Sequence, residues 1–255
     1  MMMRQYHLDL DESDVGRYVL MPGDPHRVSA IAAYLSDARE MSFHREFCTW
    51  TGYLGQTRVS VVSSGIGGPS TAIALEELAA LGVHTVIRTG TCGLLQPGDN
   101  RGTLVIATGC YRGGSTANAY VPLNYPAIAD FELVEALCTA ARSRGVSPRV
   151  GVIESKDAFF LESPQYLPCV EEATMHWDIM QRAGILATEM ESDTIFVIAQ
   201  LRKMRAASVL FGLGSHHGVE DMSPMSSDEL DTLSRVAIGA LEAIIESDKR
   251  KISIE

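Results

Sequence analysis

Glycine-rich or polar clusters follow four short apolar runs in this sequence, and this arrangement constrains the fold more than any other feature. The clusters come after Met21, after Ser63, after Thr89 and near Glu189. Segments with the apolar spacing of helices stand between the runs, and strands that alternate with helices are typical of an α/β fold. Ligands of open α/β sheets bind outside the strand ends. We therefore expect the four clusters to converge on one site.

The pattern predicts a single domain over residues 1–255, with a mixed central β-sheet flanked by helices. We expect strands at Tyr18–Met21, Val59–Ser63, Val86–Thr89, Leu104–Ala107, Val150–Ile153, Ile185–Glu189 and Ala207–Leu213. Glycine clusters are expected to end the strands at Ser63 and Thr89. Helices are expected around 28–35, from an N-cap at Ser70 to Gly82, at about 131–141, at 194–201 and in an amphipathic stretch from Leu230 to Ile244.

The net charge of −11 argues against nucleic acid or an anionic membrane as a partner, because both require a basic surface. An anionic substrate would need a local cluster of arginines and backbone N–H groups. No apolar stretch reaches the length of about 18 residues that a membrane span needs, and the N-terminus lacks the apolar region of a signal peptide. We expect a cytoplasmic location. The scattered cysteines indicate neither a disulfide framework nor a zinc site; they are Cys48, Cys92, Cys110, Cys138 and Cys169.

The glycines do not form a dinucleotide fingerprint. In Gly65-x-Gly67 the third glycine position is Ser70, and no acidic residue after a following strand completes the motif. No Walker A sequence and no G-x-S-x-G elbow occurs.

Arg27 and Arg88 indicate a phosphate site, since each stands close to a glycine at a predicted strand end. Guanidinium groups match phosphate oxygens bidentately, and glycine lets backbone N–H groups approach an anion. Thr91 can add a hydroxyl donor. The alternative is that these arginines are ordinary surface cations, which is a weak explanation for Arg88 at the end of an apolar run.

Over nearly its whole length, and in order, the chain resembles the nucleoside phosphorylase-I family, and within it the uridine phosphorylase branch. The similar segments are Pro22-Gly23-Asp24-Pro25-His26-Arg27, His44-Arg45-Glu46-Phe47, Gly65-Ile66-Gly67-Gly68-Pro69-Ser70, Ile87-Arg88-Thr89-Gly90-Thr91-Cys92-Gly93, Tyr125-Pro126-Ala127-Ile128-Ala129-Asp130-Phe131 and Glu189-Met190-Glu191-Ser192. The resemblance implies the phosphorylase/hydrolase-like fold of that family. It also implies a pentosyltransferase of nucleoside salvage that cleaves a nucleoside with phosphate to a free base and ribose 1-phosphate.

The resemblance implies roles for individual residues. Phosphate would be bound by Gly23, Arg27, Arg88, Thr91 and, from a neighbouring subunit, Arg45. Ribose would be bound by Thr91, Glu189, Met190, Glu191 and His7, with residues 1–8 forming an arm that reaches an adjacent active site. Glu191 would chelate the ribose hydroxyls, although an acidic residue is also favoured at a helix N-terminus.

Phosphate is the co-substrate in this mechanism, and no cofactor is required. Cleavage passes through an oxocarbenium-like state that bound phosphate stabilises and then captures. The resemblance also implies a structural monovalent cation such as K⁺, because some relatives hold one between subunits at the positions that match Glu46, Ile66 and Ser70. The resemblance further implies a homo-oligomer, a hexamer built as a trimer of dimers.

The base pocket departs from the family pattern. The uridine phosphorylase branch carries Gln-x-Arg where this chain has Ser163 and Gln165, so the resemblance implies that these two residues and Phe159 contact the base. The arginine expected after the last strand falls near His216, which is the fourth expected base contact. Phe159 can stack on a base, although an apolar aromatic is more often part of the core. His216 is the remaining donor, so we count it with Arg88 and Glu191 as catalytic.

Three hypotheses stay open at this point: a uridine-like nucleoside phosphorylase with an altered base pocket, a purine or modified-nucleoside phosphorylase, and a catalytically silent nucleoside-binding or storage homologue. The intact phosphate residues disfavour the third. Without the family's base-reading arginine, we predict that unmodified uridine is a weak substrate or that His216 recognises it.

Overall fold

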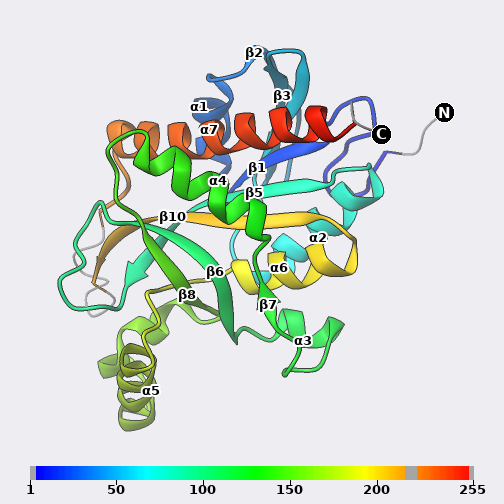
Figure 1. The fold of residues 1–255 in the computed structure, drawn as a ribbon. Coiled ribbons are helices and arrows are strands. Elements are labelled where there is room, and N and C mark those ends of the chain that lie inside the picture. The colour runs from blue at the N-terminus through cyan, green and yellow to red at the C-terminus, as the bar shows by residue number, and fades with distance from the viewer. Residues whose placement is uncertain (1–3, 216–222, 253–255) are drawn as a thin grey trace.

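The computed structural model describes residues 4–215 and 223–252, which form a twisted sheet with helices on both faces (Figure 1). The strands of the described residues are β1 (Tyr18–Pro22), β2 (Ser36–His44), β3 (Phe47–Leu54), β4 (Thr57–Val62), β5 (Thr85–Leu94), β6 (Leu104–Gly113), β7 (Ala127–Ile128), β8 (Arg149–Lys156), β9 (Ala187–Glu189) and β10 (Arg205–Ser215). Parallel and antiparallel pairs both occur. The predicted mixed α/β fold is confirmed.

Part of the sheet closes on itself around β5. Strand β5 pairs with β10, and the pairing continues through β6, β8 and β9 back to β5. On its other side β5 pairs with β1, which leads to β4, β3 and β2 at the outer edge. Because β5 belongs to both the ring and the open sheet, its residues lie at the centre of the molecule.

Helices cover the two faces of the sheet. They are α1 (Val28–Ala32), α2 (Gly68–Ala80), α3 (Thr116–Tyr120), α4 (Phe131–Arg142), α5 (Val170–Arg182), α6 (Ser192–Leu201) and α7 (Ser227–Ile252). Helices α4 and α7 pack together on one face, while α2, α3 and α6 pack on the other (Figure 1). Helix α5 stands apart at the lower end of Figure 1, where its Trp177 and Met180 form a small second core with Leu95 and Ile185. Within the described ranges, none of the helices has the length and hydrophobicity to cross a membrane.

Strand β5 is longer than predicted, because the expected loop at Gly90–Gly93 is part of the strand. Strand β10 pairs with β5 along its whole length, including Gly90, Thr91 and Cys92, and so keeps the segment extended. On the opposite side β1 pairs with β5 only as far as Thr89, and β9 joins it only at Gly93. The segment between these two pairings has a strand neighbour on one side only, which leaves room for a ligand.

The start of α2 also differs from prediction, since Ser70 is not its N-cap. Gly67 is the N-cap, with a φ of 85°, and the helix begins at Gly68. Only glycine adopts this backbone conformation at low cost. The Ser70 hydroxyl instead bonds back to the preceding loop, with its Oγ 2.7 Å from the carbonyl oxygen of Ser64. A Cβ on Gly65 would lie 2.3 Å from that hydroxyl, so this loop can form only with glycine there.

Candidate active site

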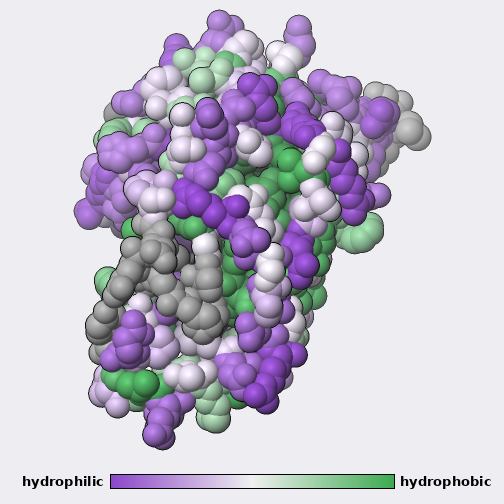
Figure 2. Space-filling view, turned by 90° about the vertical axis from the view of Figure 1, so that its left-hand side faces the viewer, coloured by the Kyte–Doolittle hydropathy of each residue, from purple (hydrophilic) through white to green (hydrophobic). Residues whose placement is uncertain are grey.

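A pocket of about 580 Å³ lies where the carboxyl ends of β1 and β5 meet the loops before α2 and α6. This volume is in the range of small-molecule sites. All four sequence clusters contribute to its wall, and the cluster after Ser63 does so through Gly65, Ile66 and Ser70. The lining residues are Gly23, Asp24, Pro25, Arg27, Glu46, Gly65, Ile66, Ser70, Arg88, Gly90, Thr91, Cys92, Gly93, Lys156, Phe159, Glu162, Thr188, Glu189, Met190, Glu191 and Leu213. Figure 2 views the side of the molecule at which β10 ends and shows a hydrophobic strip between hydrophilic margins on that side.

Arg88 is a buried cation at the end of the pocket next to the Gly23 loop, with 3% of its surface exposed. Its Nε donates to Glu189 Oε2 at 2.8 Å, and its Nη2 forms an ion pair with Glu191. Burial by itself lowers the pKa of Arg88, but the two carboxylates outweigh burial and raise it. Nη1 is buried and has no hydrogen-bond partner among the described residues. A buried N–H without an acceptor is costly, so this group is suited to an anionic ligand.

Glycine residues make this placement of Arg88 feasible. A Cβ on Gly90 would lie 2.7 Å from both Cζ and Nη2 of Arg88, so the guanidinium folds over Gly90 in space that any other side chain would fill. On the adjacent strand end, a Cβ on Gly23 would lie 3.9 Å from Arg88 Nη1. The spare donor of Arg88 therefore faces the backbone of the first glycine loop.

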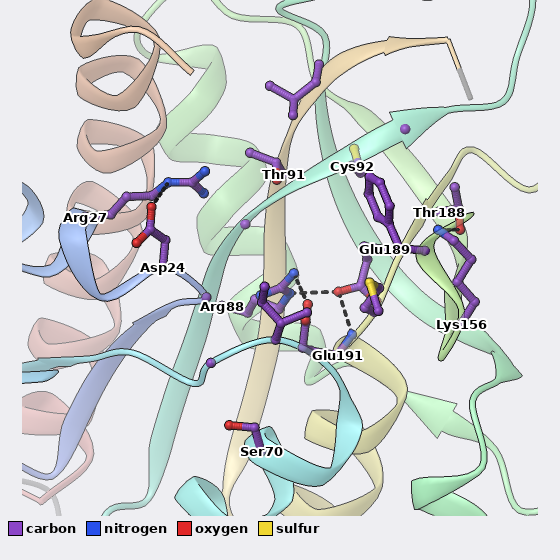
Figure 3. Close-up of a pocket in the computed structure, with 18 of the residues that line it drawn as sticks. Asp24, Arg27, Ser70, Arg88, Thr91, Cys92, Lys156, Thr188, Glu189 and Glu191 are labelled. Carbon is purple, nitrogen blue, oxygen red and sulfur yellow. Dashed lines mark hydrogen bonds and ion pairs between the residues drawn. The ribbon is translucent and has the colours of Figure 1, made fainter. Parts of the chain in front are cut away.

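Arg27 brings a second guanidinium to the same end of the pocket. It belongs to a short 3-10 helix, Pro25–Arg27, which Asp24 caps by accepting a hydrogen bond from His26 N at 2.9 Å. Burial lowers the pKa of Arg27, and the charge of Arg88 lowers it further. In Figure 3 the guanidinium of Arg27 points toward Thr91 on β5. Two cations held near each other leave a position of positive potential between them, which attracts an anion.

Glu189 and Glu191 occupy the next part of the pocket, and their environments push their pKa values apart. Burial alone would raise the pKa of Glu189, but Arg88, the Ser155 hydroxyl and backbone N–H groups lower it below its ordinary value. Burial raises the pKa of Glu191, and the charge of Glu189 adds to this. Glu191 Oε1 accepts a hydrogen bond from Gly67 N at 2.7 Å. Glu189 is thus a fixed structural anion, while Glu191 is held at the pocket wall.

Most of the predicted site residues lie together in this pocket. The pocket is lined by residues predicted to bind phosphate, ribose, the base and a cation. The predicted phosphate-binding residues are Gly23, Arg27, Arg88 and Thr91, and the predicted ribose-binding residues are Glu189, Met190 and Glu191. Phe159 and the predicted cation ligands Glu46, Ile66 and Ser70 complete this set. Ser70 Oγ donates to Glu46 Oε1 at 3.0 Å, which joins the loop after β2 to α2.

The remaining predicted residues lie elsewhere or outside the described residues. Arg45 is exposed in the turn between β2 and β3, with a φ of 58°, and does not line its own pocket. His7 is held on the outside of α2 by Glu77, with its Nδ1 2.7 Å from Glu77 Oε1. Ser163 is buried behind the pocket wall, and Gln165 lines a separate surface depression beside α5. His216 lies outside the described residues.

The structure adds three polar residues that sequence reasoning missed. They are Lys156, Glu162 and Thr188, which line the pocket, and both charged side chains are buried. A signal was present, because the charged residues Glu154 and Lys156 come directly after the predicted strand Val150–Ile153, where the strand continues in the structure.

This fold and site define the class of the protein: the chain belongs to the phosphorylase superfamily, whose family model matches residues 17–246. Among its relatives is a uridine phosphorylase of Treponema pallidum (strain Nichols), which is 41% identical over 249 residues and aligns with 96% of this chain and 95% of that protein. A guanosine phosphorylase of Halorubrum lacusprofundi is 33% identical over 251 residues, 95% of this chain and 100% of that protein. The crystal structure of a uridine phosphorylase from Vibrio fischeri ES114 superposes with a TM-score of 0.82 at 30% identity and covers 96% of this chain and 98% of that one. The predicted family is confirmed.

Proposed function

We propose that this chain is a nucleoside phosphorylase that cleaves a uridine-like or related nucleoside with inorganic phosphate. The observation that carries the proposal is the buried Arg88, with Arg27 nearby. Its Nη1 lies beside the Gly23 loop and has no acceptor in the part of the chain that the structure describes. An anion with several oxygen acceptors satisfies these donors, and phosphate is such an anion. An enzyme that used water as its nucleophile would have no need of this arrangement.

The reaction follows from the order of groups along the pocket. The glycosidic C1′–N bond breaks and its electron pair moves to the base, while a phosphate oxygen forms the new bond to C1′. The proton carried by HPO₄²⁻ balances the one that the departing base takes up, and no organic cofactor is needed. Glu191 accepts hydrogen bonds from the vicinal ribose hydroxyls, and its charge stabilises the cationic sugar in the transition state.

The charges support a site completed by a neighbouring subunit. Carboxylates outnumber cations among the residues that line the pocket, so a phosphate dianion needs a further cation. The carboxylates are those of Asp24, Glu46, Glu162, Glu189 and Glu191, and the cations are Arg27, Arg88 and Lys156. Arg45 is exposed at a hairpin tip and is not one of the described residues that line the pocket of its own subunit. We place it in the phosphate site of the neighbour, and His7 with residues 1–8 at the neighbour's ribose site. The proposed assembly is a hexamer of single-domain subunits, arranged as a trimer of dimers in the cytoplasm.

The oxygen atoms of three predicted cation ligands suit a monovalent cation. Glu46 offers a carboxylate, Ile66 a backbone carbonyl and Ser70 a hydroxyl, which are the kinds of oxygen ligand that hard cations bind. Glu46 Oε1 and Ser70 Oγ already lie 3.0 Å apart. These residues would hold K⁺ at the mouth of the pocket, where it would strengthen subunit contact rather than take part in the reaction.

The test is a cleavage assay on a nucleoside panel that includes uridine and guanosine, with and without phosphate. We expect cleavage only with phosphate, and one equivalent of ribose 1-phosphate per base released. Equal cleavage in phosphate-free buffer, with free ribose as product, would identify a nucleosidase. Binding of nucleosides without any cleavage would identify a silent homologue.

A further inference from the structure

Lys156 and Glu162 form a buried ion pair in the wall of the pocket, at a distance from the arginines. Each side chain is 2% exposed, and Lys156 Nζ lies 2.5 Å from Glu162 Oε1. Figure 3 shows Lys156 and Thr188 at one side of the pocket and Arg27 at the opposite side, with Glu189 and Glu191 between them. Since the phosphate and ribose residues occupy the other positions, this pair lies where the base of a nucleoside would be.

Neighbouring side chains fix the ammonium of Lys156. Its Nζ donates to Thr188 Oγ1 at 2.8 Å and stands 5.9 Å from the centre of the Trp177 ring. Thr188 in turn donates to Glu154, which is bonded to His176 on α5 at 2.6 Å. An ammonium has three N–H donors, and the contacts with Glu162 and Thr188 use two of them. The third has no acceptor among the described residues and is available to a group in the pocket.

Glu162 has a spare acceptor beside this spare donor. Its Oε2 is buried without a hydrogen-bond partner among the described residues, which is costly for a carboxylate unless a ligand supplies an N–H. Glu162 and Phe159 belong to one short 3-10 helix, Phe159–Glu162, and both line the pocket. A planar ligand stacked on Phe159 would therefore have its edge near the carboxylate.

We propose that Lys156 and Glu162 together recognise the base of the nucleoside, and that they select a carbonyl next to a ring N–H. Lys156 donates to the carbonyl oxygen and Glu162 Oε2 accepts from the N–H. Uracil, hypoxanthine and guanine present this edge. Cytosine and adenine present an amino group and a ring nitrogen acceptor, which would meet the ammonium and the carboxylate with the wrong polarity. The proposal rests on the proposed function and names the substrate class of the same site.

The pair also favours departure of the base. As the C1′–N bond breaks, its electron pair moves into the ring and negative charge grows on the carbonyl oxygen. The hydrogen bond from Lys156 then strengthens, without transfer of the lysine proton. Lys156 thus supplies the hydrogen-bond donor to the base, a role that the sequence analysis gave to His216. With this donor, recognition of uridine needs no arginine.

The experiment compares kcat/KM for uridine with that for cytidine, and for inosine with that for adenosine, in wild type and in Glu162→Gln. The wild type should favour the carbonyl member of each pair by about 100-fold or more, because the amino member leaves buried groups unpaired. The amide of Glu162→Gln can donate to the ring nitrogen of cytosine, so the preference should fall at least about 10-fold. The KM for phosphate should stay unchanged.

Two further variants separate recognition from stability. Lys156→Met should lower kcat for uridine more than it changes the KM for phosphate. If this variant fails to fold because Glu162 is left as an unpaired buried charge, the double variant Lys156→Met, Glu162→Gln removes that charge. Asp248→Asn is the matched control, since it breaks an ion pair with Arg205 outside the pocket and should leave the base preference intact.

The outcomes distinguish the two proposals. Phosphorolysis of uridine and cytidine at similar rates, or an unchanged preference in folded Glu162→Gln, would overturn base recognition by this pair and leave the phosphorylase function standing. Absence of phosphorolysis with every nucleoside would overturn the proposed function itself.

Discussion

Two buried cations stand at opposite ends of the pocket and differ in the hydrogen-bonding atoms that residues 4–215 and 223–252 leave unused. Arg88 has two carboxylate partners in these ranges and one spare donor. Lys156 has one carboxylate partner, Glu162, which itself has a spare acceptor. The first end has an unused N–H donor on Arg88 with the guanidinium of Arg27 nearby, and is suited to an anion. The second offers a donor and an acceptor side by side and is suited to a neutral polar edge. The kind of ligand group that each end can bind therefore depends more on the hydrogen-bonding atoms that a buried ion pair leaves unused than on the total charge of the pair.

The largest expected effect comes from removing the cation at the anion end. Arg88→Ala should lower kcat by about 10²-fold or more and raise the KM for phosphate, because a preorganised charge donor is lost from the transition state. Steady-state kinetics with varied phosphate measure both. The variant also leaves Glu189 without its ion pair, so a melting curve must show that it is folded. Near-normal phosphate kinetics in a folded variant would refute the assignment.

A smaller effect should appear in the pH dependence, through Glu191. Its pKa is raised above the ordinary 4.5 by burial and by Glu189, and only the ionised form accepts from both ribose hydroxyls. The value of kcat/KM should therefore decline as the pH falls through this raised pKa, at a higher pH than an exposed glutamate would give. Glu191→Gln should lower activity and remove this acid limb. Retention of the same limb in Glu191→Gln would assign it to another group.

The smallest effect should come from Arg45, which can act only across a subunit interface. Arg45→Ala should raise the KM for phosphate less than Arg88→Ala does, since an exposed side chain is less preorganised. Mixed and reassembled Arg45→Ala and Arg88→Ala subunits should recover activity, because a mixed dimer contains one site with both arginines. Failure to recover activity, in mixtures shown to exchange subunits, would place Arg45 outside the site.

The sequence predicted the anion end of the pocket far better than the base end. The residues of the anion end stand within short motifs at the ends of predicted strands, so the motifs alone predicted that they share one site. These residues are Gly23, Arg27, Arg88 and Glu191. Their assigned roles in phosphate and ribose binding stay predictions. The extension of β5 beyond Thr89 was missed because it depends on pairing with β10, which no local pattern in the sequence reveals.

The base end could not be predicted because its residues come from distant elements. Lys156, Glu162 and Thr188 belong to β8, a 3-10 helix and β9, and only the fold brings them together. Strand β2 was missed for a related reason: its side chains are largely exposed, so it has no apolar run. The predicted base reader Gln165 lies in a different depression from the pocket, and the role of His216 stays a prediction.

The most direct test of the account measures two quantities on the same two variants: the KM for phosphate and the uridine to cytidine preference, in Arg88→Ala and in Glu162→Gln. The account predicts a crossed result. Arg88→Ala should change the phosphate KM and keep the base preference, and Glu162→Gln should keep the phosphate KM and lose the preference. If both variants changed both quantities together, or if Arg88→Ala altered the base preference alone, the assignment of separate roles to the two ends of the pocket would be contradicted.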